Sequence, residues 1–219
     1  MEKIRVLCYG DSNTWGFIPA GNHKRYDRCE RWTSLLSEKL GNDYEVIEEG
    51  LSSRTLLSPD DDGSPGKVGY DYLIPCLDTH DPVDIVILML GTNELKTVNN
   101  KSSEEIGYML EEYFVKTILN KENRSNNTYP KLIIVCPPIV DEDKELCASW
   151  NNFVGAYEKS IKLDKIYSDI AKRNKCFYLS NEGFETGIDG IHLTKESHAL
   201  LSDKLYDIIN NIYNNRSAK

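Results

Sequence analysis

The chain of 219 residues contains no long hydrophobic run, because no stretch approaches the roughly 18 consecutive apolar residues that span a bilayer. Its first residues, Met1, Glu2 and Lys3, lead straight into a short strand-like segment and not into a signal-type apolar region. These absences argue against a membrane partner, and we expect the protein to be cytoplasmic.

Positive charge is also scarce. The chain carries 26 Lys and Arg residues against 35 Asp and Glu residues, which gives a formal net charge of −9. An acidic protein repels the phosphates of nucleic acids and anionic lipids unless it has a local basic face. The Lys and Arg residues are scattered along the sequence, so we expect no nucleic-acid partner.

Disulfide and metal-binding patterns are missing as well. None of the six cysteines forms a C-x-x-C pair: they are Cys8, Cys29, Cys76, Cys136, Cys147 and Cys176. Without a secretory segment, small buried apolar residues are favoured over disulfides. His23, His80 and His198 lack the spacing of metal ligands or of a catalytic base, so surface or structural roles are favoured. The run Asp60-Asp61-Asp62-Gly63 lacks the alternating ligands of a calcium loop, and a solvated loop is favoured there.

What the sequence does contain is an alternation of strand-like and helical segments. Short runs rich in Val, Ile and Tyr predict strands at residues 4–9, 44–49, 84–90, 131–136 and 176–179. Apolar residues at three and four spacing predict helices at residues 32–40, 103–119, 157–173 and 195 to about 212. This order predicts right-handed βαβ units and one α/β domain over residues 1–219, with about 214–219 as a frayed tail. We expect a three-layer α/β/α sandwich around a five-stranded parallel sheet in the flavodoxin-like order 2-1-3-4-5.

Local signals refine this outline. Ser102 and Glu105 predict a capping box, and Thr194 is the expected N-cap of the last helix. The expected inner face of that helix consists of Leu201, Leu205, Ile208 and Ile212. The irregular segments 58–69 and 137–150 follow strand-side elements, where loops of an open parallel sheet surround the ligand crevice.

The most informative segment follows the first predicted strand and reads Gly10-Asp11-Ser12-Asn13-Thr14-Trp15-Gly16. A serine in such a turn is well placed for nucleophilic attack, but its hydroxyl needs an imidazole to take its proton. The segment Asp189-Gly190-Ile191-His192 offers an imidazole and a carboxylate just ahead of the last helix. Taken alone, Ser12 is better explained as an N-cap or turn serine. Asp11 is expected to fix the turn through an Asx-type bond.

A third segment changes that balance. Gly91-Thr92-Asn93-Glu94 comes directly after the third predicted strand, which puts the Asn93 amide at the same sheet edge as Ser12. A side-chain amide can donate a hydrogen bond to the oxyanion that develops when a carbonyl is attacked. Nucleophile, base, orienting carboxylate and oxyanion donor are therefore all available in one chain.

These pieces resemble, in their order, the SGNH hydrolases, also called the GDSL family of esterases and lipases. The matching segments span nearly the whole chain and are residues 10–16, 49–55, 91–94 and 189–194. The resemblance implies Ser12 as nucleophile, His192 as general base and then acid, and Asp189 as the group that orients His192. It also implies oxyanion donors from the Asn93 side chain and the Ser12 backbone N–H, with no metal or cofactor.

The second matching segment would supply the remaining oxyanion donor. Many family members carry glycine at the position aligned with Ser53, and we prefer the backbone N–H of Ser53 to that of Gly50. The third segment usually reads Gly-x-Asn-Asp in the family, so Glu94 departs from it, and bracing a loop is the expected role. Lys96 is favoured as a solvated charge. The expected substrate-binding residues are neighbours of the catalytic groups in sequence, Trp15, Thr92 and Ile191, with ordinary packing an equal alternative for Trp15.

Within the family, Trp15 and the runs 31–33, 48–52 and 88–93 look most like the bacterial arylesterase and acyltransferase branch. That branch passes short acyl groups to water, alcohols or hydrogen peroxide, and the resemblance implies a small ester as substrate and assembly into homo-oligomers. A carbohydrate acetylesterase or a thioesterase with the same triad is an alternative. A non-catalytic, flavodoxin-like module that binds phosphate or a nucleotide at residues 10–16 is another, although neither G-x-G-x-x-G nor a P-loop lysine is present.

Overall fold

The structure of the protein is a computed structural model that describes residues 2–59 and 66–214. Five strands form one parallel sheet in the order β2-β1-β3-β4-β5. The strands are β1 (Ile4–Gly10), β2 (Tyr44–Gly50), β3 (Ile85–Met89), β4 (Lys131–Val135) and β5 (Phe177–Leu179). The predicted sheet order and all five predicted strands are confirmed.

Side chains that alternate along the strands form a separate core on each face of the sheet. In β1, Leu7 and Tyr9 belong to the core on one face, and Val6 and Cys8 belong to the core on the other. This division follows from the strand itself, in which successive side chains point to opposite faces. β3 is buried along its whole length, as a central parallel strand covered on both faces must be.

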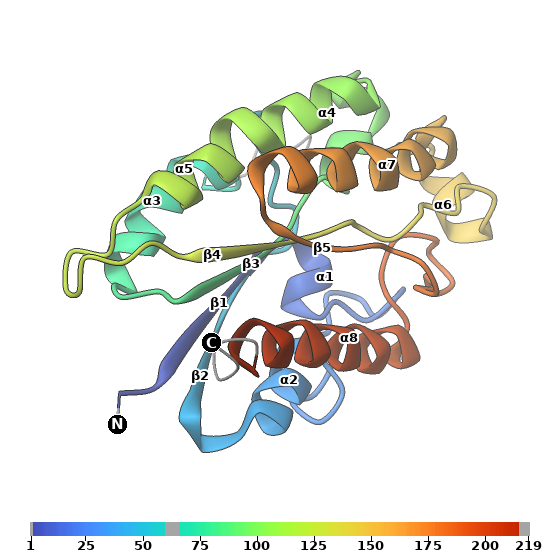
Figure 1. The fold of residues 1–219 in the computed structure, drawn as a ribbon. Coiled ribbons are helices and arrows are strands. Elements are labelled where there is room, and N and C mark those ends of the chain that lie inside the picture. Colours follow the sequence, from blue (N-terminus) through green and yellow to red (C-terminus); the bar gives the residue numbers. More distant parts are fainter. Residues whose placement is uncertain (1, 60–65, 215–219) are drawn as a thin grey trace.

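Two layers of helices cover these cores, so the three-layer architecture is confirmed (Figure 1). One layer contains α3 (Gly69–Thr79), α4 (Ser103–Met109), α5 (Lys116–Asn120) and α7 (Ala156–Asn174), and the other contains α2 (Trp32–Leu40) and α8 (Lys195–Asn214). A π-helical turn, Leu110–Val115, joins α4 to α5 within one continuous helix. Single turns of 3-10 helix lie at Gly41–Asp43, Asn93–Leu95 and Thr97–Asn99. The four predicted helices are therefore confirmed.

The helix caps and one buried face were also predicted. The Ser102 hydroxyl accepts the N–H of Glu105 at 3.1 Å, and the Glu105 carboxylate accepts the N–H of Ser102 at 2.8 Å, which confirms the capping box. The N–H of Ser197 donates to the Thr194 hydroxyl at 3.1 Å, so the N-cap of α8 is confirmed. Of the expected inner face of α8, Leu201, Leu205 and Ile212 are buried, and Ile208 is partly buried against the same core. The fully buried residue of that turn is Ile209, which the sequence analysis did not include.

Three helices escaped the sequence analysis: α1 (Ser12–Trp15), α3 and α6 (Glu145–Trp150). α3 begins at a glycine, follows Val68 without a capping side chain and contains Pro75, so its local sequence opposes a helix. Its buried residues Leu73 and Cys76 pack into the core and outweigh that preference. The expected irregular segment 58–69 lies in part outside the described residues, and the acidic run 60–63 lies entirely outside them.

No helix in the described part of the chain is both long and apolar enough to cross a membrane. All six cysteines are free thiols. Four of them, Cys8, Cys76, Cys136 and Cys147, are buried, whereas Cys29 is exposed. The interpretation as small buried residues is thereby confirmed for four of the six cysteines, whereas Cys176 is partly buried and Cys29 is exposed.

Candidate active site

The segment of residues 10–16, which carries Ser12, starts at the carboxyl end of β1, level with the ends of β2 and β3. Gly10, the last residue of β1, pairs with Gly50 of β2 and Met89 of β3. A side chain on Gly10 would place its Cβ 2.0 Å from the Thr14 hydroxyl and 2.7 Å from the Met89 carbonyl oxygen, so only glycine fits. Ser12 is the first residue of α1 and lies just beyond this edge.

Asp11 shapes the turn that presents Ser12. Its carboxylate accepts the N–H of Asn13 at 2.9 Å, which confirms the predicted Asx-type bond. Complete burial raises the pKa of Asp11 to about 6, against the hydrogen bond from Asn13 and the nearby His192, which act to lower it. Asp11 therefore caps α1 from the protein interior and has no access to a substrate.

Ser12, His192 and Asp189 form a continuous chain of hydrogen bonds. The His192 Nε2 atom lies 3.0 Å from the Ser12 hydroxyl, and the Nδ1 atom lies 2.8 Å from a carboxylate oxygen of Asp189. The other Asp189 oxygen accepts the backbone N–H groups of Ile191 at 3.1 Å and His192 at 3.0 Å. The structure thus brings Ser12 together with two neighbouring residues from the far end of the sequence, in the order needed to move a proton away from a serine hydroxyl.

The Asp189 carboxylate is held in its charged form. Burial acts to raise its pKa, but the hydrogen bond and charge of His192, helped by the backbone N–H groups of Ile191 and His192, outweigh burial and lower it. The side chain of Asp189 is fully shielded from solvent. A fixed anion at Nδ1 holds the imidazole with Nε2 toward Ser12 and stabilises the imidazolium that forms when the proton moves.

The predicted oxyanion donors lie on the other side of Ser12. Asn93 opens the 3-10 turn after β3 and lines the same cavity as Ser12, with its amide nitrogen 2.9 Å from the Arg54 carbonyl oxygen. Ser53 also lines this cavity and has a φ of +65°, the left-handed region in which glycine is favoured. Gly50 does not line it, because its Cα faces the backbone of α1, where a Cβ would lie 2.2 Å from the Trp15 nitrogen. The geometry favours Ser53 over Gly50 as the donor from this segment.

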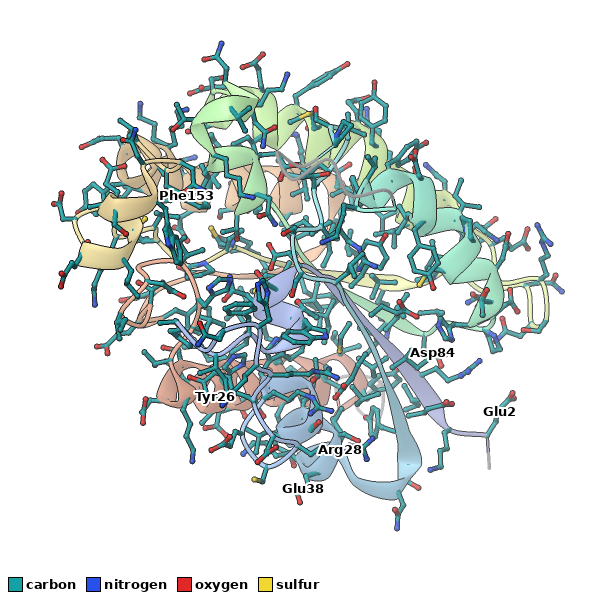
Figure 2. The ribbon with its side chains drawn as sticks, turned by 180° about the vertical axis from the view of Figure 1, so that it is seen from behind. Glu2, Tyr26, Arg28, Glu38, Asp84 and Phe153 are labelled. Atoms are coloured by element: carbon teal, nitrogen blue, oxygen red, sulfur yellow. The ribbon has the colours of Figure 1, made fainter. Side chains whose placement is uncertain are left out.

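A cavity of about 350 Å³ opens in front of the Ser12 hydroxyl. Its apolar walls come from Phe17, Trp150, Phe153 and Ile191, so Ile191, one of the expected substrate-binding residues, lies at the cavity. Its polar walls include Ser52, His23, Lys67, Lys96 and Asn152. Phe153 lies at the end of the molecule opposite to Glu2 and Asp84, which mark the amino ends of β1 and β3 (Figure 2). The cavity therefore lies at the carboxyl edge of the sheet, the ordinary location of ligand sites in this architecture.

Comparison with protein families identifies this arrangement. The GDSL-like lipase/acylhydrolase family matches residues 8–200. The chain belongs to this family. The family match confirms the resemblance drawn from the four sequence segments and the prediction of a carboxylic ester hydrolase.

Solved structures of family members are closely similar to this chain. The carbohydrate acetylesterase Est24 from Sinorhizobium meliloti is 33% identical, with a TM-score of 0.89 over 96% of this chain and 100% of that one. An inhibitor-bound aryl esterase from M. smegmatis is 33% identical, with a TM-score of 0.87 over 95% and 99%. A putative arylesterase from Agrobacterium tumefaciens is 27% identical, with a TM-score of 0.84 over 95% and 99%. Comparison with curated proteins returns no match.

Two of the expected substrate-binding residues of this GDSL-like protein lie elsewhere. Thr92 is buried, with 2% of its surface exposed, and does not line the cavity. Trp15 points away from the cavity, with the Arg25 guanidinium 5.4 Å from its ring centre. Sequence neighbours of a catalytic residue alternate in direction through a tight turn, so adjacency alone does not put them in the pocket.

Phe17 and His23 line the cavity although the sequence analysis did not place them there. The Phe17 ring stacks on the His192 ring, with 4.3 Å between ring centres and 25° between planes. The His23 ring meets Phe17 edge-on at 6.0 Å; His23 is exposed, as the favoured surface role predicts, and it lies at the cavity. The loop that carries both residues also donates the N–H of Ala20 to Asp189 at 3.2 Å. This loop folds back over His192 without regular secondary structure, so no periodic pattern in the sequence predicts its position.

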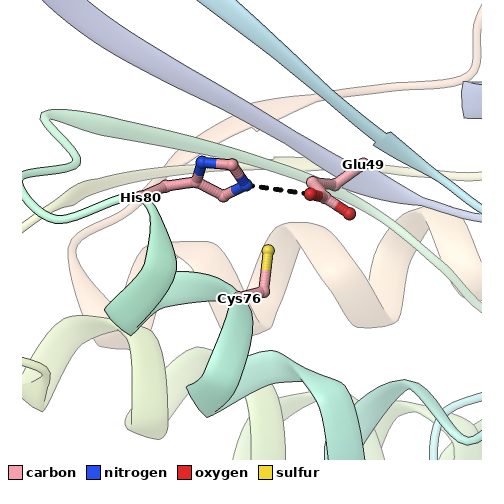
Figure 3. Close-up of side chains that lie close together, drawn as sticks. All are labelled: Glu49, Cys76 and His80. Atoms are coloured by element: carbon pink, nitrogen blue, oxygen red, sulfur yellow. Dashed lines mark hydrogen bonds and ion pairs between the residues drawn. The ribbon is translucent and has the colours of Figure 1, made fainter.

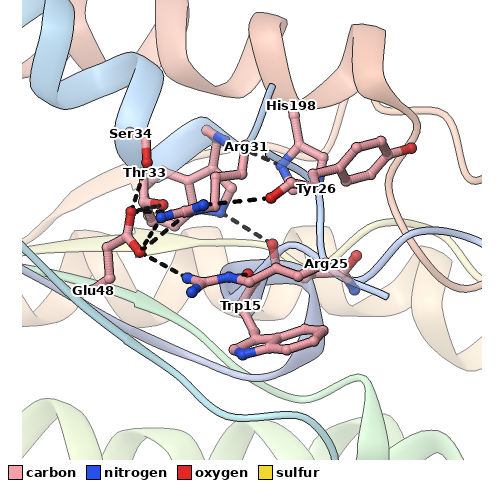
Figure 4. Close-up of polar contacts among 10 residues, drawn as sticks. Trp15, Arg25, Tyr26, Arg31, Thr33, Ser34, Glu48 and His198 are labelled. Atoms are coloured by element: carbon pink, nitrogen blue, oxygen red, sulfur yellow. Dashed lines mark hydrogen bonds and ion pairs between the residues drawn. The ribbon is translucent and has the colours of Figure 1, made fainter. Parts of the chain in front are cut away.

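A partly buried network around Glu48 anchors this loop to the sheet (Figure 4). The Glu48 carboxylate of β2 binds Arg31 at 2.9 Å and Arg25 at 2.7 Å, and it accepts the hydroxyls of Thr33 at 2.9 Å and Ser34 at 2.8 Å. Burial acts to raise the pKa of Glu48, but the hydrogen bonds from Arg31, Ser34 and Thr33 lower it to about 2. Glu48 is therefore an anion that fixes the second half of this loop and the start of α2.

Arg54 connects the ends of β1 and β2 to the turn that carries Asn93. Its guanidinium donates to the Gly10 carbonyl oxygen at 3.0 Å and to the Glu49 carbonyl oxygen, and its own carbonyl accepts the Asn93 amide. The Glu94 carboxylate accepts the N–H of Leu56, which confirms the predicted bracing role. These contacts hold the Ser53 turn against the ends of β1 and β3.

Lys96 and His198 are both buried. Lys96 is buried, with 8% of its surface exposed, and lines the cavity wall, so its interpretation as a solvated charge is wrong. His198 is buried and accepts the N–H of Trp32 at 3.3 Å, which confirms a structural role. Burial, with a small contribution from His192, lowers the pKa of His198 to about 3 and keeps it neutral.

Proposed function

We propose that this protein is a serine esterase that hydrolyses or transfers short acyl groups through an acyl-Ser12 intermediate. The observation that carries the proposal is the hydrogen-bonded chain from Ser12 through His192 to Asp189 at the floor of the 350 Å³ cavity. A serine, an imidazole and a buried carboxylate in this order are sufficient for acyl transfer without a metal.

In the proposed first half of the reaction, the Ser12 hydroxyl attacks the ester carbonyl while His192 Nε2 accepts its proton. The carbonyl oxygen gains the negative charge and is stabilised by the Asn93 amide and the backbone N–H groups of Ser12 and Ser53. When the tetrahedral intermediate collapses, the bond to the leaving alcohol breaks and His192 returns the proton to it. Asp189 stays ionised throughout.

In the second half, water or another alcohol enters the site vacated by the leaving group. His192 accepts its proton, the new oxygen attacks the acyl carbon, and the bond to Ser12 breaks with return of the proton to the serine. The ratio of hydrolysis to transfer then depends on which nucleophile reaches the acyl-enzyme first. Family membership leaves the alternative of a non-catalytic phosphate-binding module without support.

The cavity favours a small acyl group. Its volume of about 350 Å³ is near the lower end for ligand pockets, and it must hold both parts of the ester. Phe17, Ile191 and Phe153 supply an apolar wall for the acyl chain, and the polar walls suit a hydroxylated leaving group. Similarity to a carbohydrate acetylesterase and to an aryl esterase supports acetylated sugars and aryl acetates as the two substrate classes to compare.

A substrate panel tests this proposal. We expect turnover of 4-nitrophenyl acetate and of a peracetylated sugar. Because the cavity is small, kcat/KM should fall at least about tenfold from the acetyl to the octanoyl ester, which corresponds to about 1.4 kcal/mol. The thioester analogue and added alcohol acceptors define the leaving group and the transfer ratio. Preference for the octanoyl ester would contradict the short-acyl assignment, and an inactive wild-type protein would contradict the esterase itself.

We also propose that the protein self-associates. Val98, Trp150 and Val154 expose large apolar side chains, and Trp150 belongs to the cavity wall, so a second copy covering this patch would narrow the entrance. Light scattering on the eluting peak of a size-exclusion column tests this. A monomer at every concentration would contradict the proposal, and Val98→Asp together with Val154→Asp is expected to dissociate an oligomer.

A further inference from the structure

Three side chains with metal-binding chemistry meet between β2 and α3, outside the catalytic cavity (Figure 3). Glu49 comes from the end of β2, Cys76 from the last turn of α3, and His80 from the C-cap of that helix. The Nε2 atom of His80 lies 2.9 Å from a carboxylate oxygen of Glu49. One potential ligand atom from each of the three residues lies within 4.8 Å of the others. In the described ranges, this is the one group of His, Cys, Asp and Glu with such geometry.

The helix geometry explains how two of these groups come together. Cys76 and His80 are four residues apart, so they lie one above the other on the same side of the last helical turn. The spacing is visible in the sequence, but α3 was not predicted, and Glu49 is contributed by a distant strand. His80 was expected to lack the spacing of a metal ligand because α3, which places it beside Cys76, was not predicted.

Contacts that need no ion hold both elements in place. The Arg5 guanidinium of β1 donates to the His80 carbonyl oxygen at 2.9 Å, and the Tyr9 hydroxyl donates to the Gly69 carbonyl oxygen at 2.6 Å. A Cβ on Gly69 would lie 2.6 Å from the Thr55 carbonyl oxygen, so the start of α3 packs directly on the adjoining loop. The three side chains are thus presented by a rigid frame, which lowers the cost of binding a ligand.

The donor atoms of the cluster suit a cation. The Glu49 carboxylate lies 2.9 Å from the His80 Nε2 atom and accepts the Tyr72 hydroxyl at 3.5 Å, and the Cys76 sulfur lies within 4.8 Å of the Glu49 and His80 ligand atoms. A divalent ion between them would balance one thiolate and one carboxylate, and the thiol proton would be released to solvent on binding.

We propose that Glu49, Cys76 and His80 form a binding site for a divalent ion of the zinc class. The donor set is one thiolate, one imidazole and one carboxylate, which selects zinc over magnesium and calcium, and three protein ligands leave a fourth position for water. The side chains of Glu49 and His80 are 19% and 22% exposed, so the ion can enter from solvent. This site is separate from the proposed esterase chemistry and would function whether or not Ser12 is the nucleophile.

Cobalt titration tests the site directly, because cobalt replaces zinc in such donor sets and a thiolate ligand gives a charge-transfer absorption band in the near ultraviolet. Metal-free, reduced protein is titrated with cobalt chloride, and zinc chloride is then added in competition. We expect a thiolate band that saturates at one equivalent and disappears with zinc. Since His192 also carries an imidazole, the thiolate band distinguishes the proposed site from binding at the catalytic histidine.

Four variants, each checked by thermal melting, complete the experiment. Cys76→Ser is expected to abolish the band, and His80→Gln is expected to weaken zinc binding by about tenfold or more, the scale seen even for outer partners at metal sites. The matched controls Cys29→Ser and His23→Gln should bind as the wild type does. The proposal is overturned by absence of a thiolate band in the wild type, by its persistence in Cys76→Ser, or by its loss in Cys29→Ser. If Cys76→Ser does not fold, unchanged zinc affinity in His80→Gln overturns it instead, since His80 lies at the surface of the cluster.

Discussion

At the scale of single residues, the reactivity proposed for Ser12 depends on side chains from a distant part of the chain. Ser12 itself follows β1, whereas its proposed proton acceptor His192 and the carboxylate of Asp189 come from the turn before α8. These three positions were predictable because each lies in a short segment with a recognisable order. Phe17 and His23 were not predictable, since their place over the base depends on how a loop without periodicity folds back.

The stacked ring of Phe17 is expected to position His192. We predict that Phe17→Ala lowers kcat/KM for an aryl acetate by about 3- to 10-fold, the equivalent of one aromatic pair, and that Phe17→Tyr restores most of it. Steady-state kinetics over a range of pH, with thermal melts, measure this. Phe177→Ala on the surface of β5 is the matched control. Activity of Phe17→Ala equal to that of the wild type would remove Phe17 from the positioning role.

The Asn93 amide is expected to act on the transition state more than on the bound ester. We predict that Asn93→Ala lowers kcat by about 10²- to 10³-fold with a small change in KM, as loss of one oxyanion donor does elsewhere. Asn152→Ala changes another amide of the same cavity wall and should leave kcat nearly unchanged. Equal losses in the two variants would mean that Asn93 serves only to hold the Arg54 carbonyl, the contact it makes in the structure.

At the scale of elements, the sheet and most helices follow from local patterns, whereas the connecting loops do not. The apolar runs of β1 and β3 and the periodicity of α2, α7 and α8 were sufficient to define those elements. α3 was missed because Pro75 and an uncapped start oppose a helix locally, and only burial of its inner face explains its formation. The cluster of Glu49, Cys76 and His80 was missed for the same reason.

The Glu48 network is expected to make the stability of the loop anchor dependent on pH. The pKa of Glu48 is lowered from 4.5 to about 2, so its stabilising effect is fully present above its unfolded value and is lost as pH falls toward 2. At about 1.4 kcal/mol per pKa unit, Glu48→Gln should lower the free energy of unfolding by about 3 kcal/mol at pH 7. The difference between variant and wild type should shrink steadily between about pH 5 and pH 2.

Denaturant unfolding at several pH values measures this effect. Glu38→Gln is the matched control, because Glu38 is an exposed glutamate on α2 and its replacement should change stability little at any pH. A gap between Glu48→Gln and wild type that stays constant from pH 7 to pH 3 would show that packing, and not the ionised carboxylate, is what the substitution removes.

At the scale of the whole molecule, the parallel sheet explains why distant segments converge. Strands that run in the same direction end at one edge, so Ser12 after β1, Ser53 after β2 and Asn93 after β3 meet there without any local signal linking them. Strand order was therefore sufficient to predict that Ser12 and Asn93 lie at the same edge of the sheet. The walls of the cavity were not predictable, because Trp150, Phe153 and Lys96 reach it from segments whose course depends on tertiary packing.

The central claim is a covalent acyl-enzyme at Ser12, and acid quenching of the reaction tests it most directly. The protein is mixed with excess 4-nitrophenyl acetate, quenched within the first turnovers, digested with trypsin and analysed by tandem mass spectrometry. The account predicts one acetyl group on Ser12, in the peptide of residues 6–24, and its absence from Ser12→Ala and His192→Ala. Full turnover by Ser12→Ala, or an acetyl group on another residue that forms and decays at the rate of turnover, would contradict it.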